Sequence, residues 1–249
     1  MTDFPPPAPG RPLAAGLGWI RSRISNAFVL REGSQVYLID SGWSERAGVI
    51  RSRFAQASVP VENVTHILLT HQHPDHMGGA AYLRWMAEAQ VICHRLDAGA
   101  VEGTAPRVGP WIGRALLRSH PVKVDRKVED GDTIGPFTVI HLPGHTPGSV
   151  AYYHKERRIL FSGDAVVTRP GGVALASKFA TYDPERAIDS LQKLARLDIA
   201  VLLSGHGPPL TQDVSRGLTR LVERYSHFEP PRLWTLAGPE GLPETHPKG

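Results

Sequence analysis

Residues 71–76 read His-Gln-His-Pro-Asp-His and follow the apolar run 67–69 after a single residue, Thr70. In an extended segment, residues two apart point to the same side, so His71 and His73 can reach one cation together. Asp75 and His76 then face elsewhere, near the amino end of the helix expected to follow, where a carboxylate is stabilised. We therefore predict a metal site here, with a second cation at Asp75 and His76.

Three further candidate ligands, His145, Asp164 and His206, also follow apolar runs. Each lies just after a predicted strand, so residues that are distant in the sequence can gather at one rim of a sheet. A lone histidine in a turn is more commonly a surface or hydrogen-bonding residue. Seven such residues together favour a metal site. Imidazole and carboxylate ligands without thiolate suit Zn²⁺, and they are also compatible with Fe or Mn.

Short apolar runs separated by turn residues predict β-strands at 27–30, 36–39, 66–69, 91–93, 137–140, 150–153, 159–161 and 201–203. Helical periodicity predicts helices at 49–57, 80–89, 184–197 and 211–225. Many of the strands are apolar on consecutive residues, which is typical of sheets that are covered on both faces. We expect an α/β protein in which two β-sheets are sandwiched between helices.

The length of 249 residues is compatible with one domain. Residues 1–18 and 239–249 are rich in Pro and Gly, and we predict an extended lead-in and a flexible tail. The charge of +4 comes without a Lys or Arg run, so no nucleic-acid partner is expected. Cys93 is the single cysteine and is predicted to lie in the core. With no signal peptide and no long apolar stretch, we expect a cytoplasmic protein without a membrane partner.

The complete pattern, His71-x-His73-x-Asp75-His76 followed by His145, Asp164 and His206, resembles the metallo-β-lactamase-fold hydrolases, with a metal site of the glyoxalase II type. The resemblance implies a four-layer αββα sandwich of two mixed sheets flanked by helices. It also implies that His71, His73 and His145 bind one metal, that Asp75, His76 and His206 bind a second, and that Asp164 bridges the two. Asp40, just after the run 36–39, would orient the ligands without binding a metal itself.

The implied activity is hydrolysis of a small ester, thioester or lactone. Two divalent ions would generate a bridging hydroxide as the nucleophile, and Asp75 would pass a proton to the leaving group. The alternatives are an iron-dependent sulfur dioxygenase, a β-lactamase-like enzyme and a noncatalytic metal-binding relative. Ala165 to Val167 lack the tyrosine that typical homoserine-lactone lactonases carry shortly after the bridging aspartate, which counts against that branch.

Substrate contacts are expected from the two least regular stretches, residues 99–122 and 166–182. The candidates are Trp111 in the first stretch and Arg169, Lys178 and Tyr182 in the second. Substrate loops on rigid scaffolds commonly lie over a site in this way. The alternative for Trp111 is packing of a peripheral helix onto the core. The sequence leaves the oligomeric state open, with a dimer compatible with the aromatic Trp234 near the carboxyl end.

Overall fold

The computed structural model describes residues 15–22, 24–43, 47–109 and 119–226. The first sheet has the strand order β1-β2-β3-β4-β5-β6. Its strands are Leu17–Arg21, Asn26–Glu32, Gln35–Ile39, His66–Leu68, Gln90–His94 and Arg126–Val128. β1, β2 and β3 pair antiparallel, whereas β3, β4, β5 and β6 pair parallel. The sheet is therefore mixed, and its four parallel strands all end at the same edge.

The second sheet has the strand order β13-β10-β9-β8-β7. In that order its strands are Val201–Ser204, Ile159–Gly163, Val150–His154, Phe137–His141 and Thr133–Ile134. β10 and β13 pair parallel and the other neighbours pair antiparallel. A separate hairpin is formed by β11 (Val167–Arg169) and β12 (Gly172–Ala174).

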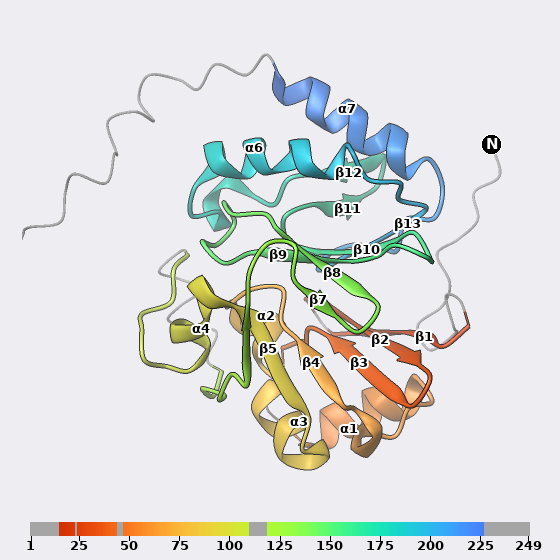
Figure 1. Ribbon diagram of the computed structural model, residues 1–249, viewed down its shortest axis with the longest axis vertical. Coiled ribbons are helices and arrows are strands. Elements are labelled where there is room, and N and C mark those ends of the chain that lie inside the picture. Colours follow the sequence, from red (N-terminus) through yellow and green to blue (C-terminus); the bar gives the residue numbers. More distant parts are fainter. Residues whose placement is uncertain (1–14, 23, 44–46, 110–118, 227–249) are drawn as a thin grey trace, which may run out of the picture.

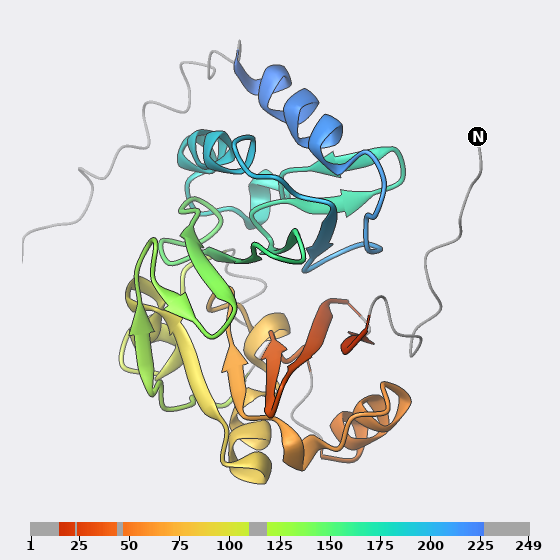
Figure 2. The same cartoon turned by 45° about the vertical axis from the view of Figure 1, so that its right-hand side comes forward.

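Helices cover the outer face of each sheet (Figures 1 and 2). α1 (Ala47–Gln56) and α3 (Ala80–Ala87) lie against the first sheet, and α6 (Pro184–Leu194) and α7 (Val214–Ser226) lie against the second. The short elements are α2 (Pro74–Met77), α4 (Arg95–Val101) and the 3₁₀ turns η1 (Val61–Asn63) and η2 (Lys178–Ala180). The predicted αββα sandwich is confirmed.

An aromatic core joins the two sheets. Phe28 of β2 meets Phe161 of β10 with ring centroids 5.7 Å apart, and Tyr37 of β3 meets Phe137 of β8 at 5.2 Å. Leu160, between two residues of this inner core, instead packs toward α6 and α7. Because successive strand residues face opposite sides, a strand covered on both faces is apolar at every position. This explains the consecutive apolar runs of the sequence.

Helix α6 begins as its sequence predicts. Asp183 is the N-cap and accepts a hydrogen bond from the Arg186 amide at 3.0 Å, and Pro184 follows at the first helical position. Leu191 and Leu194 are buried against the second sheet. This start matters because the chain enters α6 directly from the loops near the metal centre described below.

Several elements differ from those predicted. β1 begins at Leu17, inside the predicted lead-in 1–18, because Leu17 is buried in the core and pairs with Leu30. The helix expected over 80–89 ends at Ala87, and Glu88 adopts a left-handed conformation. α4, β6, β7, β11 and β12 were not predicted, because they are short and have weak periodicity. None of the helices in the described part of the chain is long and apolar enough to cross a membrane.

Candidate metal centre

The seven predicted ligands lie at one edge of the two sheets. His71 and His73 occupy the loop after β4, and α2 carries Asp75 and His76 at its start. The other three follow strands of the second sheet: His145 after β8, Asp164 directly after β10, and His206 after β13. The strand ends therefore bring together residues separated by more than a hundred positions in the chain.

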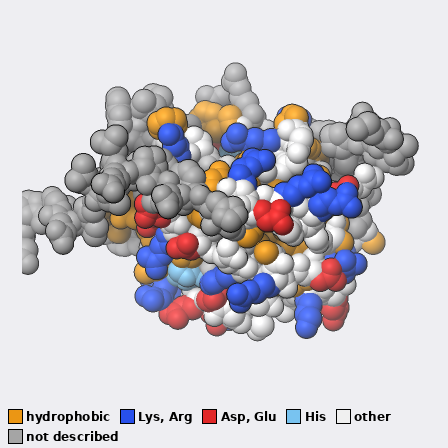
Figure 3. All heavy atoms as spheres, turned by 90° about the horizontal axis from the view of Figure 1, so that it is seen from above, with side chains coloured by type: hydrophobic (Ala, Val, Ile, Leu, Met, Phe, Trp, Pro, Cys, Tyr) orange, Lys and Arg blue, Asp and Glu red, His pale blue; other side chains and the backbone are white. Residues whose placement is uncertain are grey.

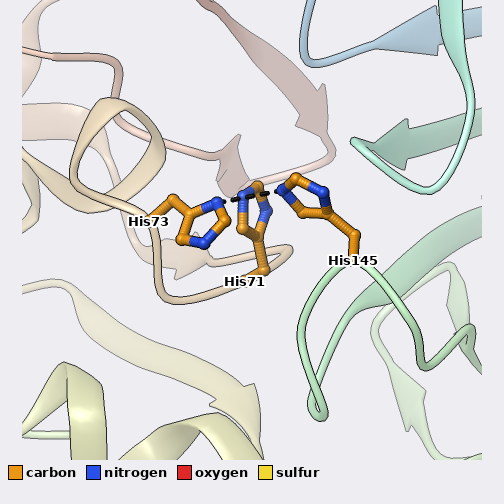
Figure 4. Close-up of side chains that lie close together, drawn as sticks. All are labelled: His71, His73 and His145. Atoms are coloured by element: carbon orange, nitrogen blue, oxygen red, sulfur yellow. Dashed lines mark hydrogen bonds between the residues drawn. The ribbon is translucent and has the colours of Figure 1, made fainter. Parts of the chain in front are cut away.

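The first group consists of His71, His73 and His145, whose ligand nitrogens all lie within 4.8 Å of one another. Nδ1 of His73 lies 2.9 Å from Nε2 of His145. Figure 4 shows the three rings converging from the loop after β4 and the turn after β8. Three imidazoles in this arrangement are a common ligand set for a divalent metal ion.

The second group consists of Asp75, His76 and His206. One carboxylate oxygen of Asp75, Oδ2, lies 3.4 Å from Nε2 of His76 and 3.4 Å from Nε2 of His206. Pro74 starts α2, so Asp75 lies in the first turn of a very short helix, and its backbone carbonyl accepts a hydrogen bond from Ser25. The carboxylate is thereby held against both rings.

Asp164 lies between the two groups. Its Oδ2 is 3.5 Å from Nε2 of His145 in the first group and 3.1 Å from Nε2 of His206 in the second. Its Oδ1 is 3.4 Å from Nε2 of His76. One carboxylate thus contacts histidines of both groups, which is the arrangement expected of a ligand shared by two metal ions.

The donor set fits metal ions of the predicted kind. Nε2 of His71 and Oδ1 of Asp164 are buried and have no hydrogen-bond partner among the described residues. Leaving buried polar atoms without a partner costs about 1–3 kcal/mol each. A bound cation would supply the missing partner, and the ligands, nitrogen and oxygen without thiolate, suit Zn²⁺, Fe or Mn.

The outward ring nitrogens of four histidines have partners of their own. They are His76 Nδ1 with Asp40 Oδ2 at 2.8 Å, His71 Nδ1 with Thr70 Oγ1 at 3.0 Å, His73 Nε2 with the Val108 carbonyl at 3.2 Å, and His206 Nδ1 with the Ile24 carbonyl at 2.6 Å. A ring that donates its outward N–H keeps the lone pair of its inner nitrogen for a metal. These contacts therefore fix both the orientation and the tautomer of the ligands.

Asp40 organises the base of the site from the end of β3. It is buried and adopts a left-handed backbone conformation with φ of 57°. Its Oδ1 accepts the Thr70 amide at 2.8 Å, and the Thr70 hydroxyl also donates to the carboxylate. Asp40 therefore holds His76 in orientation by a direct hydrogen bond and His71 through the hydroxyl of Thr70. The family resemblance implied such an orienting role for Asp40.

The electrostatics of the site separate neutral from charged histidines. Burial lowers the pKa of His71, and burial lowers that of His145 to about 3, so both rings are neutral at pH 7. Burial also opposes the charged form of His206, but hydrogen bonds to Asp164 and Asp75 raise the pKa of His206 to about 10. The two carboxylates thus hold a positive charge at this point, where a metal ion would take the proton's place.

Asp97 is a supporting residue that the sequence did not single out. It is fully buried on α4, and its carboxylate accepts hydrogen bonds from the Gln72 amide, the Gln72 side chain, the Thr146 hydroxyl and the Gly148 amide at 2.7–2.9 Å. Gln72 lies between two predicted ligands and Thr146 follows a third. The only local signal was an acidic residue soon after the apolar run 91–93, where no helix was predicted.

The four residues predicted to contact the substrate do not all lie beside the candidate metal ligands. Lys178 lines a cavity of about 430 Å³ beside His145 and Asp164. The Tyr182 amide donates to the His145 carbonyl at 3.2 Å, while its side chain is 60% exposed. Arg169 is exposed at the end of β11 and does not line that cavity. Trp111 lies outside the described residues, as does Trp234.

The charged surface has no single basic region in the view from above. Figure 3 shows Lys and Arg side chains spread over this face with acidic and uncharged side chains between them. Solvated charges of both signs are the usual state of a protein surface.

Comparison with known proteins agrees with this architecture. The probable metallo-hydrolase YflN of Bacillus subtilis (strain 168) is 29% identical over 243 residues, which cover 86% of this chain and 92% of that protein. The acyl-coenzyme A thioesterase MBLAC2 of Gallus gallus is 29% identical over 185 residues, covering 63% and 65%. The crystal structure of TTHA1623 in a di-iron-bound form superposes with a TM-score of 0.63 at 30% identity, covering 79% and 95%.

The sequence model of the Metallo-beta-lactamase superfamily matches residues 20–206, a span that begins within β1 and includes all seven candidate ligands. The matched region is more than half of the chain. Together with the two mixed sheets, their helical outer layers and the gathered histidines and aspartates, this match establishes that the chain belongs to the metallo-beta-lactamase superfamily.

Proposed function

We propose that the protein is a hydrolase with a dinuclear metal centre that cleaves a small ester, thioester or lactone. The observation that carries the proposal is the contact of Asp164 with both groups of ligands, at 3.5 Å from His145 and 3.1 Å from His206. A shared carboxylate is needed only when two ions lie side by side. His71, His73 and His145 would hold one ion, and Asp75, His76 and His206 the other.

Two such ions would make a water molecule acidic enough to act as a nucleophile near neutral pH and would polarise the substrate carbonyl. The remaining step, proton transfer, is assigned to a side chain of the protein. The Oδ2 atom of Asp75 faces His76 and His206. We therefore assign a proton-transfer role to its other oxygen, Oδ1, which would take a proton from the attacking water and pass it to the leaving group. No serine or cysteine nucleophile is required, and Cys93, the only cysteine, is buried.

The similar proteins support an acyl substrate. MBLAC2 is by name an acyl-coenzyme A thioesterase, and a thioester is among the bonds that this chemistry can cleave. The cavity of about 430 Å³ beside the candidate ligands is of the size that small molecules occupy. The partner that we propose is therefore a small-molecule substrate.

The proposal is tested by metal analysis joined to a screen of chromogenic esters, thioesters, lactones and a β-lactam. We expect about two metal ions per chain and hydrolysis in the ester or thioester class. His73→Ala should abolish hydrolysis and lower the bound metal, because His73 belongs to the first group. His120→Ala, at an exposed histidine, is the control. Full activity of His73→Ala with unchanged metal content would refute the proposal.

A second candidate is an iron-dependent dioxygenase that oxidises a persulfide. One observation favours it: the similar structure TTHA1623 is known in a di-iron-bound form. The ligand set of imidazole and carboxylate accommodates iron as well as zinc. Oxygen uptake by iron-loaded protein with a persulfide, together with an absence of hydrolysis in the screen, would select this function over the first.

A further inference from the structure

We infer that the cavity under α6 holds an apolar acyl chain of the substrate, so that the preferred substrates are esters or thioesters of carboxylic acids with several chain carbons. The inference rests on the proposed hydrolase function and specifies its substrate class. The cavity measures about 430 Å³ and lies between α6, the segment that leads into η2, and the candidate metal ligands.

The cavity is joined to the metal centre at one end. His145 and Asp164, two of the candidate ligands, form part of its wall, and Leu142 and Ala165 lie beside them. A chain that occupied the cavity would therefore end with its carboxyl carbon next to the metal centre. This is the position that the scissile carbonyl needs, so the acyl side of the substrate, rather than the leaving group, fits the cavity.

The body of the cavity is apolar. Leu175 lines it from the segment before η2, and Ile188, Leu191 and Leu194 line it from α6. Apolar surface of this kind gains free energy by excluding water from a hydrocarbon chain. A sugar or a nucleotide would bring polar groups that this wall does not satisfy.

Two of the hydroxyl groups in the wall already have hydrogen-bond partners within the protein. The Ser190 hydroxyl donates to the Pro143 carbonyl at 2.7 Å, and the Thr181 hydroxyl donates to the Ser177 carbonyl at 3.0 Å. Lys178 lines the cavity as well, and its ammonium group lies 5.3 Å from the centre of the Phe179 ring. Ser190 and Thr181 therefore do not need a polar partner from the substrate, whereas His145 and Asp164 form the polar part of the wall beside the candidate metal centre.

The test measures kcat/KM of the metal-loaded protein for acetyl, butanoyl, hexanoyl, octanoyl and decanoyl thioesters with one common thiol. Burial of each methylene group should raise kcat/KM about threefold to fourfold until the cavity is filled. Equal kcat/KM values along the series, with clear hydrolysis of every member, would overturn the cavity assignment and leave the proposed hydrolase function standing.

A matched pair of variants tests where the acyl chain of the substrate binds. Ala176 lines the cavity and is partly buried, whereas Ala180 is partly buried four residues further on and does not line it. We expect Ala176→Trp to lower the ratio of kcat/KM for octanoyl to that for acetyl at least about tenfold, and Ala180→Trp to leave that ratio unchanged. Ile188→Trp narrows the same cavity from α6 and replaces Ala176→Trp if that variant does not fold.

Binding without turnover separates this inference from the proposed function. Octanoate and acetate are titrated into the wild type and Ala176→Trp by calorimetry. Tighter binding of octanoate, lost in Ala176→Trp, supports the cavity assignment even if no ester or thioester is cleaved, in which case only the hydrolase function fails. Equal binding of octanoate by the wild type and the variant would overturn the cavity assignment.

Discussion

The Thr146 hydroxyl donates a hydrogen bond of 2.7 Å to the carboxylate of Asp97, and this contact joins two loops of the metal centre. The same carboxylate accepts the amide and the side chain of Gln72 at 2.9 Å. Gln72 lies between His71 and His73, and Thr146 directly follows His145. One buried acid on α4 thus holds the loops that carry the three histidines of the first group in position relative to each other.

Asp97→Asn should therefore lower both stability and metal affinity. The amide can no longer accept from all four donors, and its own N–H₂ group faces N–H and O–H donors. We expect a loss of about 2–4 kcal/mol in the free energy of unfolding and about tenfold or more in metal affinity. Urea unfolding and a chelator competition measure the two effects. Asp189→Asn, at an exposed position of α6, is the control. Unchanged metal affinity in Asp97→Asn would contradict the assigned role.

Asp40→Asn should weaken the metal centre without removing a ligand. Asp40 accepts from His76 Nδ1 at 2.8 Å and from the Thr70 amide at 2.8 Å, and an asparagine presents an oxygen to only one of them. Asparagine tolerates the left-handed backbone at this position, so the fold should persist. We expect metal affinity to fall about 10–100-fold. Thr70→Ser, which keeps the hydroxyl, should bind metal as the wild type does, and equal affinities of all three proteins would exclude this role.

Asp164→Asn should weaken the binding of both metal ions together, because one carboxylate contacts histidines of both groups. Elemental analysis after dialysis against dilute chelator gives the number of ions retained per chain. The exposed Asp198 provides the control, and Asp198→Asn should retain as much metal as the wild type. Retention of one full equivalent by Asp164→Asn would show that the carboxylate serves a single ion.

The stability of the metal-free protein should fall as the pH is lowered, in part through His94. His94 stacks on His141 with centroids 3.9 Å apart, and burial, assisted by His141 and Arg95, lowers the pKa of His94 to about 4. In the unfolded chain the histidine has a pKa of about 6.5. Between about pH 6.5 and about pH 4 the unfolded chain therefore binds a proton at His94 that the folded protein does not bind. The stabilisation is therefore present above about pH 6.5 and is lost toward about pH 4.

His94→Gln removes this titration while keeping an oxygen that can cap α4. Urea unfolding of metal-free protein at about pH 7 and about pH 5 should show a smaller difference for the variant than for the wild type. If the two proteins lose the same free energy of unfolding between these conditions, His94 does not contribute to the acid sensitivity.

Part of the fold could be predicted from the sequence because it depends on local chemistry. The runs at 159–161 and 201–203 have the length and apolarity of strands covered on both faces, and Asp183 followed by Pro184 marks the start of a helix. β11, β12 and α4 escaped prediction because they are short, and their stability comes from packing rather than from periodicity.

The seven candidate ligands could be named without coordinates, since residue type and position after predicted strands are local properties. How these residues are shared and supported follows from the folded arrangement. The contact of Asp164 with both groups, the four hydrogen bonds to Asp97 and the cavity under α6 all depend on how two sheets and their helices stack. Such contacts join residues far apart in the chain, and no local pattern of charge or hydrophobicity encodes their distances.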